Sequence, residues 1–169
     1  MKRKSFGEMT CPIALGLERV GDGWGFLILR DALNGMTRFE QFREHLDIAP
    51  TTLTRRLDAL VAEGLLERRR YAERPPRDDY VLTQRGRDFR PVILTLLAWG
   101  VRHFAPESRG LALIDTQTGR EAEPILVDAV SGRPISDPAF KMAPRRAATE
   151  VDRNTPARRR GTNRREVAS

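Results

Sequence analysis

Hydrogen-bonding side chains crowd the first turns of a predicted helix that begins at Pro50. The stretch TTLTRRLDALVAEGLLERR (51–69) opens with three threonines and two adjacent arginines. Hydroxyl and guanidinium groups at the leading end of a helix can meet base edges in a DNA major groove or phosphate oxygens. The same residue types also keep an ordinary helix face hydrated, so their placement on the helix has to distinguish the two interpretations.

A helical wheel at 100° per residue separates a buried stripe from an outer face. The predicted stripe consists of Leu53, Leu57, Leu60 and Val61. Arg55 lies nearly opposite this stripe, with Thr51 and Thr52 on the same outer face, followed by the small residues Ala59 and Ala62. Small side chains let a helix approach a groove closely. We therefore expect Thr51, Thr52 and Arg55 to read bases.

Flanking residues and a later hairpin supply candidate phosphate contacts. Thr54 and Arg56 lie on the two flanks of the same helix. The segment RRRYAERPPR follows, in which Arg74 and Arg77 bracket Pro75 and Pro76. Proline restricts the tip, so less conformational entropy is lost when the tip is fixed on a partner. We expect Thr54, Arg56, Arg74 and Arg77 to contact phosphates, although a charged hairpin without a partner would show the same composition.

The surrounding pattern predicts the elements that position these residues. Thr37 with Glu40 three residues later is a capping-box signature, and Pro91 is expected to kink a long final helix. Helices are predicted over 11–20, 24–33, 37–46, 50–63 and 84–103, and strands over 66–71 and 79–83. This order is that of a winged helix-turn-helix, mainly α with a small β-hairpin wing.

Charge and composition divide the chain of 169 residues unevenly. The net charge is +7, of which residues 141–169 carry +6, with nine basic and three acidic residues. The body is therefore nearly neutral, and bulk charge alone does not indicate nucleic-acid binding. We predict a flexible arm at 1–10, a DNA-binding and dimerisation domain at 11–104, a short β-rich extension at 105–140 and a disordered basic tail at 141–169.

The extension contains two similar segments, LIDTQTGREAEPI and LVDAVSGRPISDP, at an offset of 13 residues. Asp115, Thr118 and Gly119 in the first correspond to Asp128, Ser131 and Gly132 in the second. Paired turns of some zinc ribbons carry cysteines at such positions. Here Asp and Ser/Thr can close the turns by hydrogen bonds, with Gly supplying a positive φ. We expect two β-turns and no metal.

Several function classes are disfavoured. The two histidines, His45 and His103, show no metal-ligand spacing, and no paired nucleophile or phosphate-cradling loop is present, so we expect neither an enzyme nor a cofactor. The start lacks the apolar region of a secretory signal, and no apolar run is long enough to span a membrane. The single cysteine, Cys11, fits a reducing cytoplasm.

The segments CPIALGLERVGDGWGFLILRDALNGMTRFEQFREHL, TLTRRLDALVAEGLLERR, PPRDDYVLT and RGRDFRPVILTLLAWG together resemble the HxlR-type transcriptional regulators over about 11–100. The resemblance implies a cytoplasmic homodimer that binds double-stranded DNA, and two-fold symmetry predicts an inverted-repeat operator. It also implies a dimer built from the first and last helices, here with Ile13, Leu17, Phe89, Ile93, Leu96 and Leu97. Some family members sense oxidants or electrophiles through the cysteine matched by Cys11, so an oxidant or small-molecule effector is conceivable. A small residue packed near the dimer interface is the alternative for Cys11.

Four residues depart from the family pattern. Gly23 replaces a basic residue before Trp24, Ala49 replaces a capping serine, and Asp78-Asp79 adds negative charge beside Arg77. The acidic pair is expected to weaken contact between the hairpin and DNA. Two alternative functions are a winged helix used only for protein–protein contact, and nonspecific DNA association through residues 141–169.

Overall fold

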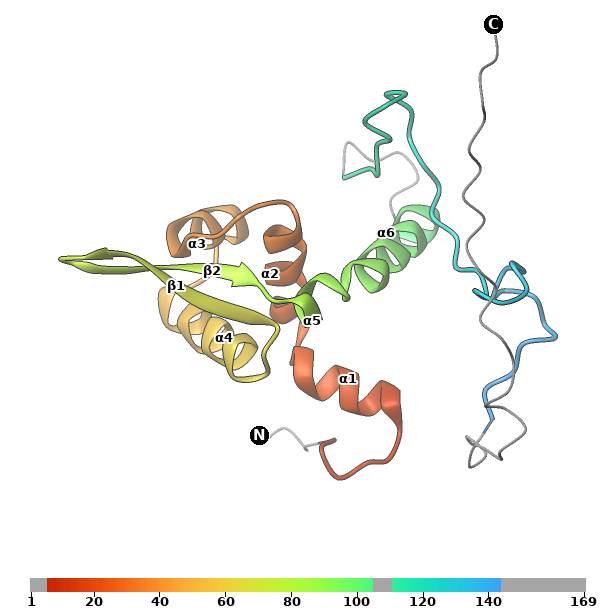
Figure 1. Cartoon of the computed structure of the whole chain (residues 1–169), viewed down its shortest axis with the longest axis horizontal. Coiled ribbons are helices and arrows are strands. Elements are labelled where there is room, and N and C mark those ends of the chain that lie inside the picture. Colours follow the sequence, from red (N-terminus) through yellow and green to blue (C-terminus); the bar gives the residue numbers. More distant parts are fainter. Residues whose placement is uncertain (1–5, 105–110, 144–169) are drawn as a thin grey trace, which may run out of the picture. The chain divides into compact units, whose positions relative to one another are not determined.

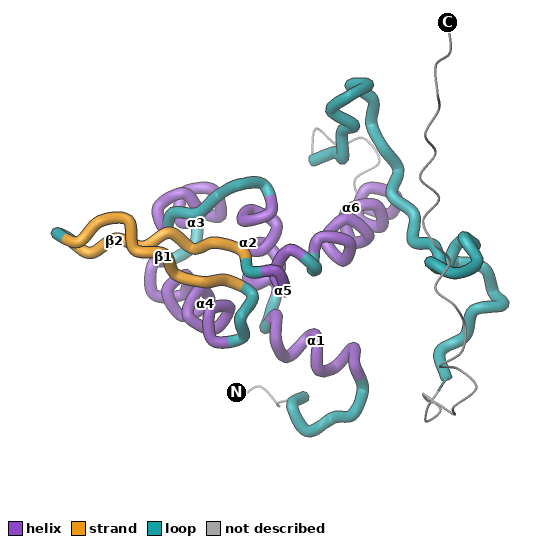
Figure 2. The backbone as a smooth tube through the Cα atoms, viewed as in Figure 1, coloured by secondary structure: helices purple, strands orange, loops and turns teal. Residues whose placement is uncertain are grey.

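The structure is a computed structural model that describes residues 6–104 and 111–143. Figures 1 and 2 show helices arranged around a central α2, with a two-stranded hairpin projecting past α3 and α4. The elements are α1 (Pro12–Val20), α2 (Gly23–Leu33), α3 (Phe39–Leu46), α4 (Pro50–Ala62), β1 (Leu66–Glu73), β2 (Pro76–Leu82), α5 (Gln84–Arg87) and α6 (Arg90–Phe104). The predicted winged helix-turn-helix is confirmed.

One apolar core holds α2, α3, α4 and the hairpin together. Its fully buried side chains are Ile28, Leu29, Phe42, Leu53, Leu57, Leu60 and Leu66. The predicted stripe of α4 is therefore buried, except that Val61 is only partly buried and packs against the core. Burial of large apolar side chains is the main stabilising term of such a small domain, and here it fixes the direction in which α4 presents its outer face.

Residues at and next to the ends of α4 determine where this helix begins and ends. Pro50 is the first helical residue, where a missing N–H costs nothing. Ala49 precedes it and makes no side-chain capping bond, as its residue type predicts. The helix ends before Gly64, whose φ of +65° belongs to the left-handed region that glycine adopts readily.

The predicted start of α3 was wrong by two residues. The helix begins at Phe39, and the capping acceptor is Gln41, whose Oε1 accepts hydrogen bonds from the backbone N–H groups of Arg38 at 2.9 Å and Thr37 at 3.0 Å. Thr37 cannot cap the helix because its backbone carbonyl accepts from Tyr80 N–H at 2.7 Å. A contact with the wing therefore prevails over the local capping signal.

The hairpin is longer than predicted. Strands β1 and β2 are antiparallel, from the pair Leu66↔Leu82 to the pair Glu73↔Pro76, with an irregularity between Arg70 and Ala72. Pro76 therefore belongs to β2, and the tip is the pair Arg74-Pro75, joined by a cis peptide bond. Arg38 forms an isolated antiparallel bridge to Asp79, which adds one residue before α3 to the edge of the sheet.

The expected single helix over 84–103 is instead two helices. The short α5 ends at Arg87, and α6 begins at Arg90. Between them Phe89 packs its ring against Phe26 of α2, with centroids 5.3 Å apart in an edge-to-face arrangement. Pro91 therefore occupies the first turn of α6, where proline is tolerated, and the predicted kink inside a continuous helix was wrong.

The described residues divide into two compact units between Ile125 and Leu126. The first predicted turn lies in one unit and the second in the other, and each is closed as expected. Gly119 and Gly132 have φ of +70° and +69°. Thr118 Oγ1 donates to Asp115 at 2.8 Å, and Ser131 Oγ donates to Asp128 at 2.7 Å.

Hydrogen bonds also lower the pKa of both turn carboxyls. The backbone N–H of Gln117 is the main cause for Asp115, and the Ser131 hydroxyl is the main cause for Asp128. The β-structure of residues 111–143 is limited to the single bridges Ile114↔Glu121 and Val127↔Pro134. Most of the predicted arm and tail lies outside the described residues.

Candidate nucleic-acid interface

The outer face of α4 presents the three predicted base-reading residues. Thr51 and Arg55 are exposed, and Thr52 is half-buried. Among the residues that the structure describes, Arg55 takes part in no ion pair or hydrogen bond. Its guanidinium group therefore retains all its donors for an external acceptor. The fold presents these three residues together because Leu53, Leu57 and Leu60 on the opposite side of α4 are buried.

The two flanking residues of α4 are engaged inside the domain. Arg56 forms an ion pair with Asp22, the residue that precedes α2, and both side chains are about three-quarters buried, with 23% and 28% exposed. Thr54 Oγ1 donates to the carbonyl oxygen of Pro50 at 2.9 Å. The structure thus places Arg56 between two helices of the core and leaves Thr54 bonded to its own helix.

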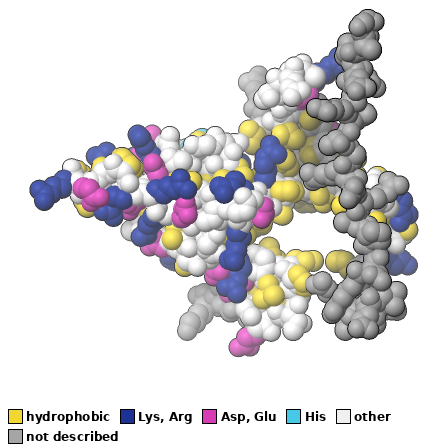
Figure 3. Space-filling view, in the orientation of Figure 1, with side chains coloured by type: hydrophobic (Ala, Val, Ile, Leu, Met, Phe, Trp, Pro, Cys, Tyr) yellow, Lys and Arg dark blue, Asp and Glu magenta, His cyan; other side chains and the backbone are white. Residues whose placement is uncertain are grey.

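The arginines of the wing form two groups, one with ion-pair partners and one without such partners among the described residues. Arg68, Arg69 and Arg70 form ion pairs with Asp58, Glu67 and Asp78, respectively. Arg74 and Arg77 are exposed and, within the described part of the chain, have no such partner. Figure 3 shows Lys and Arg side chains gathered at the projecting end of the wing. The tip is therefore locally positive although the body of the chain is nearly neutral.

The carboxylates of Asp78 and Asp79 contact other side chains of the domain. Asp78 accepts from Arg70 Nε at 2.5 Å. Asp79 accepts from Thr37 Oγ1 at 3.1 Å and lies 3.8 Å from Arg38 Nε. Each of these carboxylates thus has a polar or cationic partner in the same domain, and their expected weakening of the contact between wing and DNA stays a prediction.

Sequence reasoning missed two residues that connect the wing to the helices. The Arg38 guanidinium carbon lies 5.1 Å from the centroid of the Tyr71 ring, a cation–π distance. Arg38 therefore contacts both strands, through Tyr71 of β1 and Asp79 of β2. The available signal was an arginine just before a helix start, which is too common to single out.

The predicted dimer residues fall into two groups. Ile13, Leu17 and Leu96 are exposed, with 59%, 42% and 46% of their surface accessible. Phe89, Ile93 and Leu97 are half-buried; Phe89 packs on α2, and Ile93 and Leu97 line a cavity between α2 and α6. Two further apolar residues of α6, Val92 and Trp99, are 46% and 53% exposed. Figure 3 shows hydrophobic side chains at the surface over both α1 and α6.

Cys11 is an exposed free thiol at the residue preceding α1. In residues 6–104 and 111–143, no cluster of three or more His, Cys, Asp or Glu side chains could hold a metal ion. Within the same ranges, no helix is long and apolar enough to cross a membrane.

Known proteins with similar sequences are transcriptional regulators. The family model described as "HxlR-like helix-turn-helix" matches residues 19–108. A helix-turn-helix transcriptional regulator of Mycobacterium tuberculosis is 38% identical over 125 residues, which cover 73% of this chain and 79% of that protein. The Bacillus subtilis regulator YdeP is 34% identical over 94 residues, or 55% of this chain and 73% of its own.

Solved structures of similar fold are also described as transcription factors or regulators. PA1607, described as a transcription factor, superposes with a TM-score of 0.75 at 32% identity and covers 84% of this chain and 100% of its own. A Pseudomonas aeruginosa protein, PA1374, also described as a transcription factor, has a TM-score of 0.61 at 45% identity, with coverages of 83% and 97%. The redox regulator HypR in its reduced form has a TM-score of 0.52 at 30% identity, with coverages of 58% and 100%. Fold, motifs and relatives therefore agree that this chain belongs to the HxlR-like helix-turn-helix family of DNA-binding transcriptional regulators.

Proposed function

We propose that the protein binds an inverted-repeat operator as a homodimer, with α4 in the major groove and the wing on the phosphate backbone or in the minor groove. The proposal rests mainly on the exposure of Arg55 and on its unpaired guanidinium group among the described residues. This arginine is exposed on the outer face of α4 and free of intramolecular partners in the described residues, whereas the adjacent Arg56 is held by Asp22. A free guanidinium group at this place can donate two parallel hydrogen bonds to guanine.

The base-reading set is Thr51, Thr52 and Arg55. The set for phosphate contact is led by Arg74 and Arg77, because their charges are not neutralised within the domain. Thr54 and Arg56 are weaker candidates for phosphate contact, since their polar groups already have partners within the domain. Phosphate contacts fix orientation and supply salt-dependent affinity, and base contacts supply specificity.

Dimerisation is proposed through the exposed apolar faces of α1 and α6. Val92, Leu96 and Trp99 lie on one side of α6, while Ile93 and Leu97 face α2. Large exposed apolar side chains on successive turns of a helix usually mark a contact with another protein. A second copy is the expected occupant, because a two-fold dimer presents two recognition helices to two half-sites. A protein of this function would work in the cytoplasm, where its DNA is.

Redox control through Cys11 is a second candidate property. The thiol is free and exposed, and Cys11 is the residue that precedes α1. It is also supported by the likeness to HypR, which is a redox regulator. Loss of DNA binding after diamide treatment, restored by thiol and absent in Cys11→Ser, would support it. Equal responses of both proteins would refute it.

Selection from a random pool of DNA duplexes tests the main proposal. The full-length protein should enrich fragments that share an inverted repeat with half-site centres about one helical turn, or a multiple of it, apart. Enrichment of single half-sites would refute the dimeric arrangement. Absence of any enriched sequence would favour a protein–protein module, and binding retained by a peptide of residues 141–169 alone would favour nonspecific association.

A further inference from the structure

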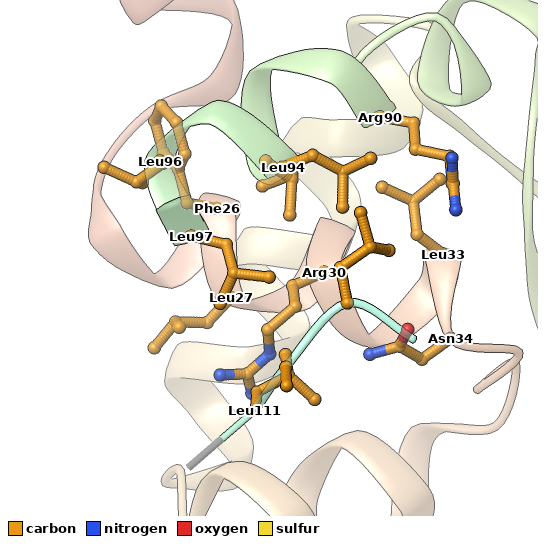
Figure 4. Close-up of a pocket in the computed structure, with 13 residues that line it drawn as sticks. Phe26, Leu27, Arg30, Leu33, Asn34, Arg90, Leu94, Leu96, Leu97 and Leu111 are labelled. Carbon is orange, nitrogen blue, oxygen red and sulfur yellow. The ribbon is translucent and has the colours of Figure 1, made fainter. Parts of the chain in front are cut away.

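A cavity of about 300 Å³ lies between α2 and α6, away from the outer face of α4. Its floor is apolar, formed mainly by Phe26, Leu27, Leu33, Ile93, Leu94 and Leu97. Leu111 and Leu113, which follow α6 in the chain, line a further side. Figure 4 shows the leucine side chains of α2 and α6 spread around this site, among them Leu27, Leu94 and Leu97. The volume is at the lower end of the range for small-molecule sites.

Two arginines give this apolar cavity a polar edge. Arg30 of α2 and Arg90, the first residue of α6, both line it, together with Asn34. In the view of Figure 4, the Arg90 guanidinium lies near Leu33 and that of Arg30 near Leu111. Among the described residues, the lining contains no Asp or Glu side chain.

The charged side chains around the cavity leave one positive charge uncompensated among the described residues. Arg30 Nε donates to Asp31 Oδ1 at 2.8 Å, and this buried carboxylate also contacts His45 Nδ1 at 2.8 Å through its other oxygen. Arg30 and Asp31 therefore compensate each other. Arg90 has no ion pair or hydrogen bond among the described residues, so its charge is available to a ligand. A cation beside an apolar wall favours a ligand that carries a single negative charge on an apolar body.

The cavity overlaps the proposed dimer face in part. Ile93, Leu94 and Leu97 of α6 line the cavity, whereas Val92 and Trp99 do not. Leu96 belongs to both surfaces, and the family resemblance also implies Ile93 and Leu97 for the dimer. A dimer formed through Val92 and Trp99 would thus leave the cavity able to accept a small molecule.

We propose that the cavity between α2 and α6 is a binding site for amphipathic organic monoanions, such as medium-chain or aromatic carboxylates. The apolar body of the ligand lies against Leu27, Leu94 and Leu97, and its carboxylate meets Arg90. Neither the site nor its ligand class depends on the proposed mode of DNA reading, since the cavity lies outside α4 and the wing.

The test is calorimetric titration of the full-length protein, without DNA, with octanoate, octanol and octylammonium. Octanoate should bind with about one molecule per chain, octanol should bind about tenfold more weakly, and octylammonium should not bind measurably. Arg90→Gln should reduce octanoate affinity to that for octanol, while Arg77→Gln, which removes an equally free arginine from the wing, should change neither. Leu94→Trp should fill the cavity and abolish binding of both ligands.

Other outcomes would overturn the proposal. Equal affinities for octanoate and octanol in the wild type, or unchanged octanoate affinity in Arg90→Gln, would show that no charge recognition occurs. Arg90 is exposed and unpaired, so its substitution remains informative even if Leu94→Trp fails to fold. If sedimentation shows that octanoate dissociates a dimer, the cavity is covered by a second copy and is not a ligand site. Failure of DNA selection with octanoate binding intact would refute only the proposed function.

Discussion

The hydroxyl of Thr37 donates a hydrogen bond to Oδ1 of Asp79 across 3.1 Å, and this contact ties the residues before α3 to strand β2 of the wing. The backbone strengthens the connection, since Tyr80 N–H donates to the carbonyl of Thr37 at 2.7 Å. The residues before α3 are thus held against β2 by a side-chain and a backbone hydrogen bond. Asp79 orients the wing although its charge has the wrong sign for DNA.

Asp79→Ala should weaken DNA binding and lower the free energy of unfolding by about 1 kcal/mol, because one partly buried hydrogen bond is lost. Glu73→Ala is the matched control, since it removes an exposed carboxylate from the same hairpin. If charge alone mattered, both variants would bind DNA more tightly. Fluorescence anisotropy with a labelled duplex and thermal unfolding measure the two effects, and tighter binding by Asp79→Ala would contradict a positioning role.

Arg74→Ala and Arg77→Ala should each weaken binding to operator and random duplexes alike. Each should also reduce the slope of log affinity against log salt by about 1, as expected for the loss of one phosphate contact. Arg69→Ala provides the comparison, because this arginine is already paired with Glu67 and should change the slope little. A series of binding curves at increasing salt gives the slopes. Unchanged slopes for both tip variants would exclude the wing from the phosphate contacts.

Trp99→Glu should convert the dimer into monomers at micromolar concentration, because it places a charge in the proposed apolar contact. Ile125→Glu is the control, since Ile125 is an exposed apolar residue, 68% accessible, outside that face. Sedimentation velocity distinguishes the two states. A wild-type monomer, or a Trp99→Glu dimer as stable as wild type, would contradict the proposed interface.

The purified protein should carry no stoichiometric zinc. The paired turns at 115–120 and 128–133 have carboxylate and hydroxyl groups where zinc ribbons have thiolates, and those groups already bond to one another within each turn. Elemental analysis of protein prepared without chelator measures the metal content. About one zinc per chain would contradict this expectation, and removal of that zinc should then lower the melting temperature.

The sequence predicted the features that depend on local pattern. Pro50 and Gly64 mark the ends of α4, and the periodicity of Leu53, Leu57 and Leu60 places Arg55 on the outer face. These signals act within a few residues, so the helical wheel captures them. The order of elements and the family followed from the same local signals and from the motifs.

Features that depend on contacts between distant residues could not be predicted. The ion pair of Arg56 joins it to Asp22, 34 residues earlier, and the break before α6 accompanies a contact between Phe89 and Phe26. Ile93 and Leu97 of α6 line the cavity beside α2, while Val92, Leu96 and Trp99 are exposed. A helical wheel places all five residues on one wide apolar face, but which part of that face contacts α2 depends on the packing of two distant helices.

The outer face of α4 is proposed to read bases through Arg55, and the decisive measurement is the binding of Arg55→Ala to operator and random duplexes. We expect a loss of about 1–3 kcal/mol on the operator and much less on random DNA, so discrimination falls. Arg77→Ala should instead weaken both and preserve discrimination, and circular dichroism should show both variants folded. If folded Arg55→Ala still discriminates between the two duplexes as well as wild type does, base reading by this face of α4 is contradicted.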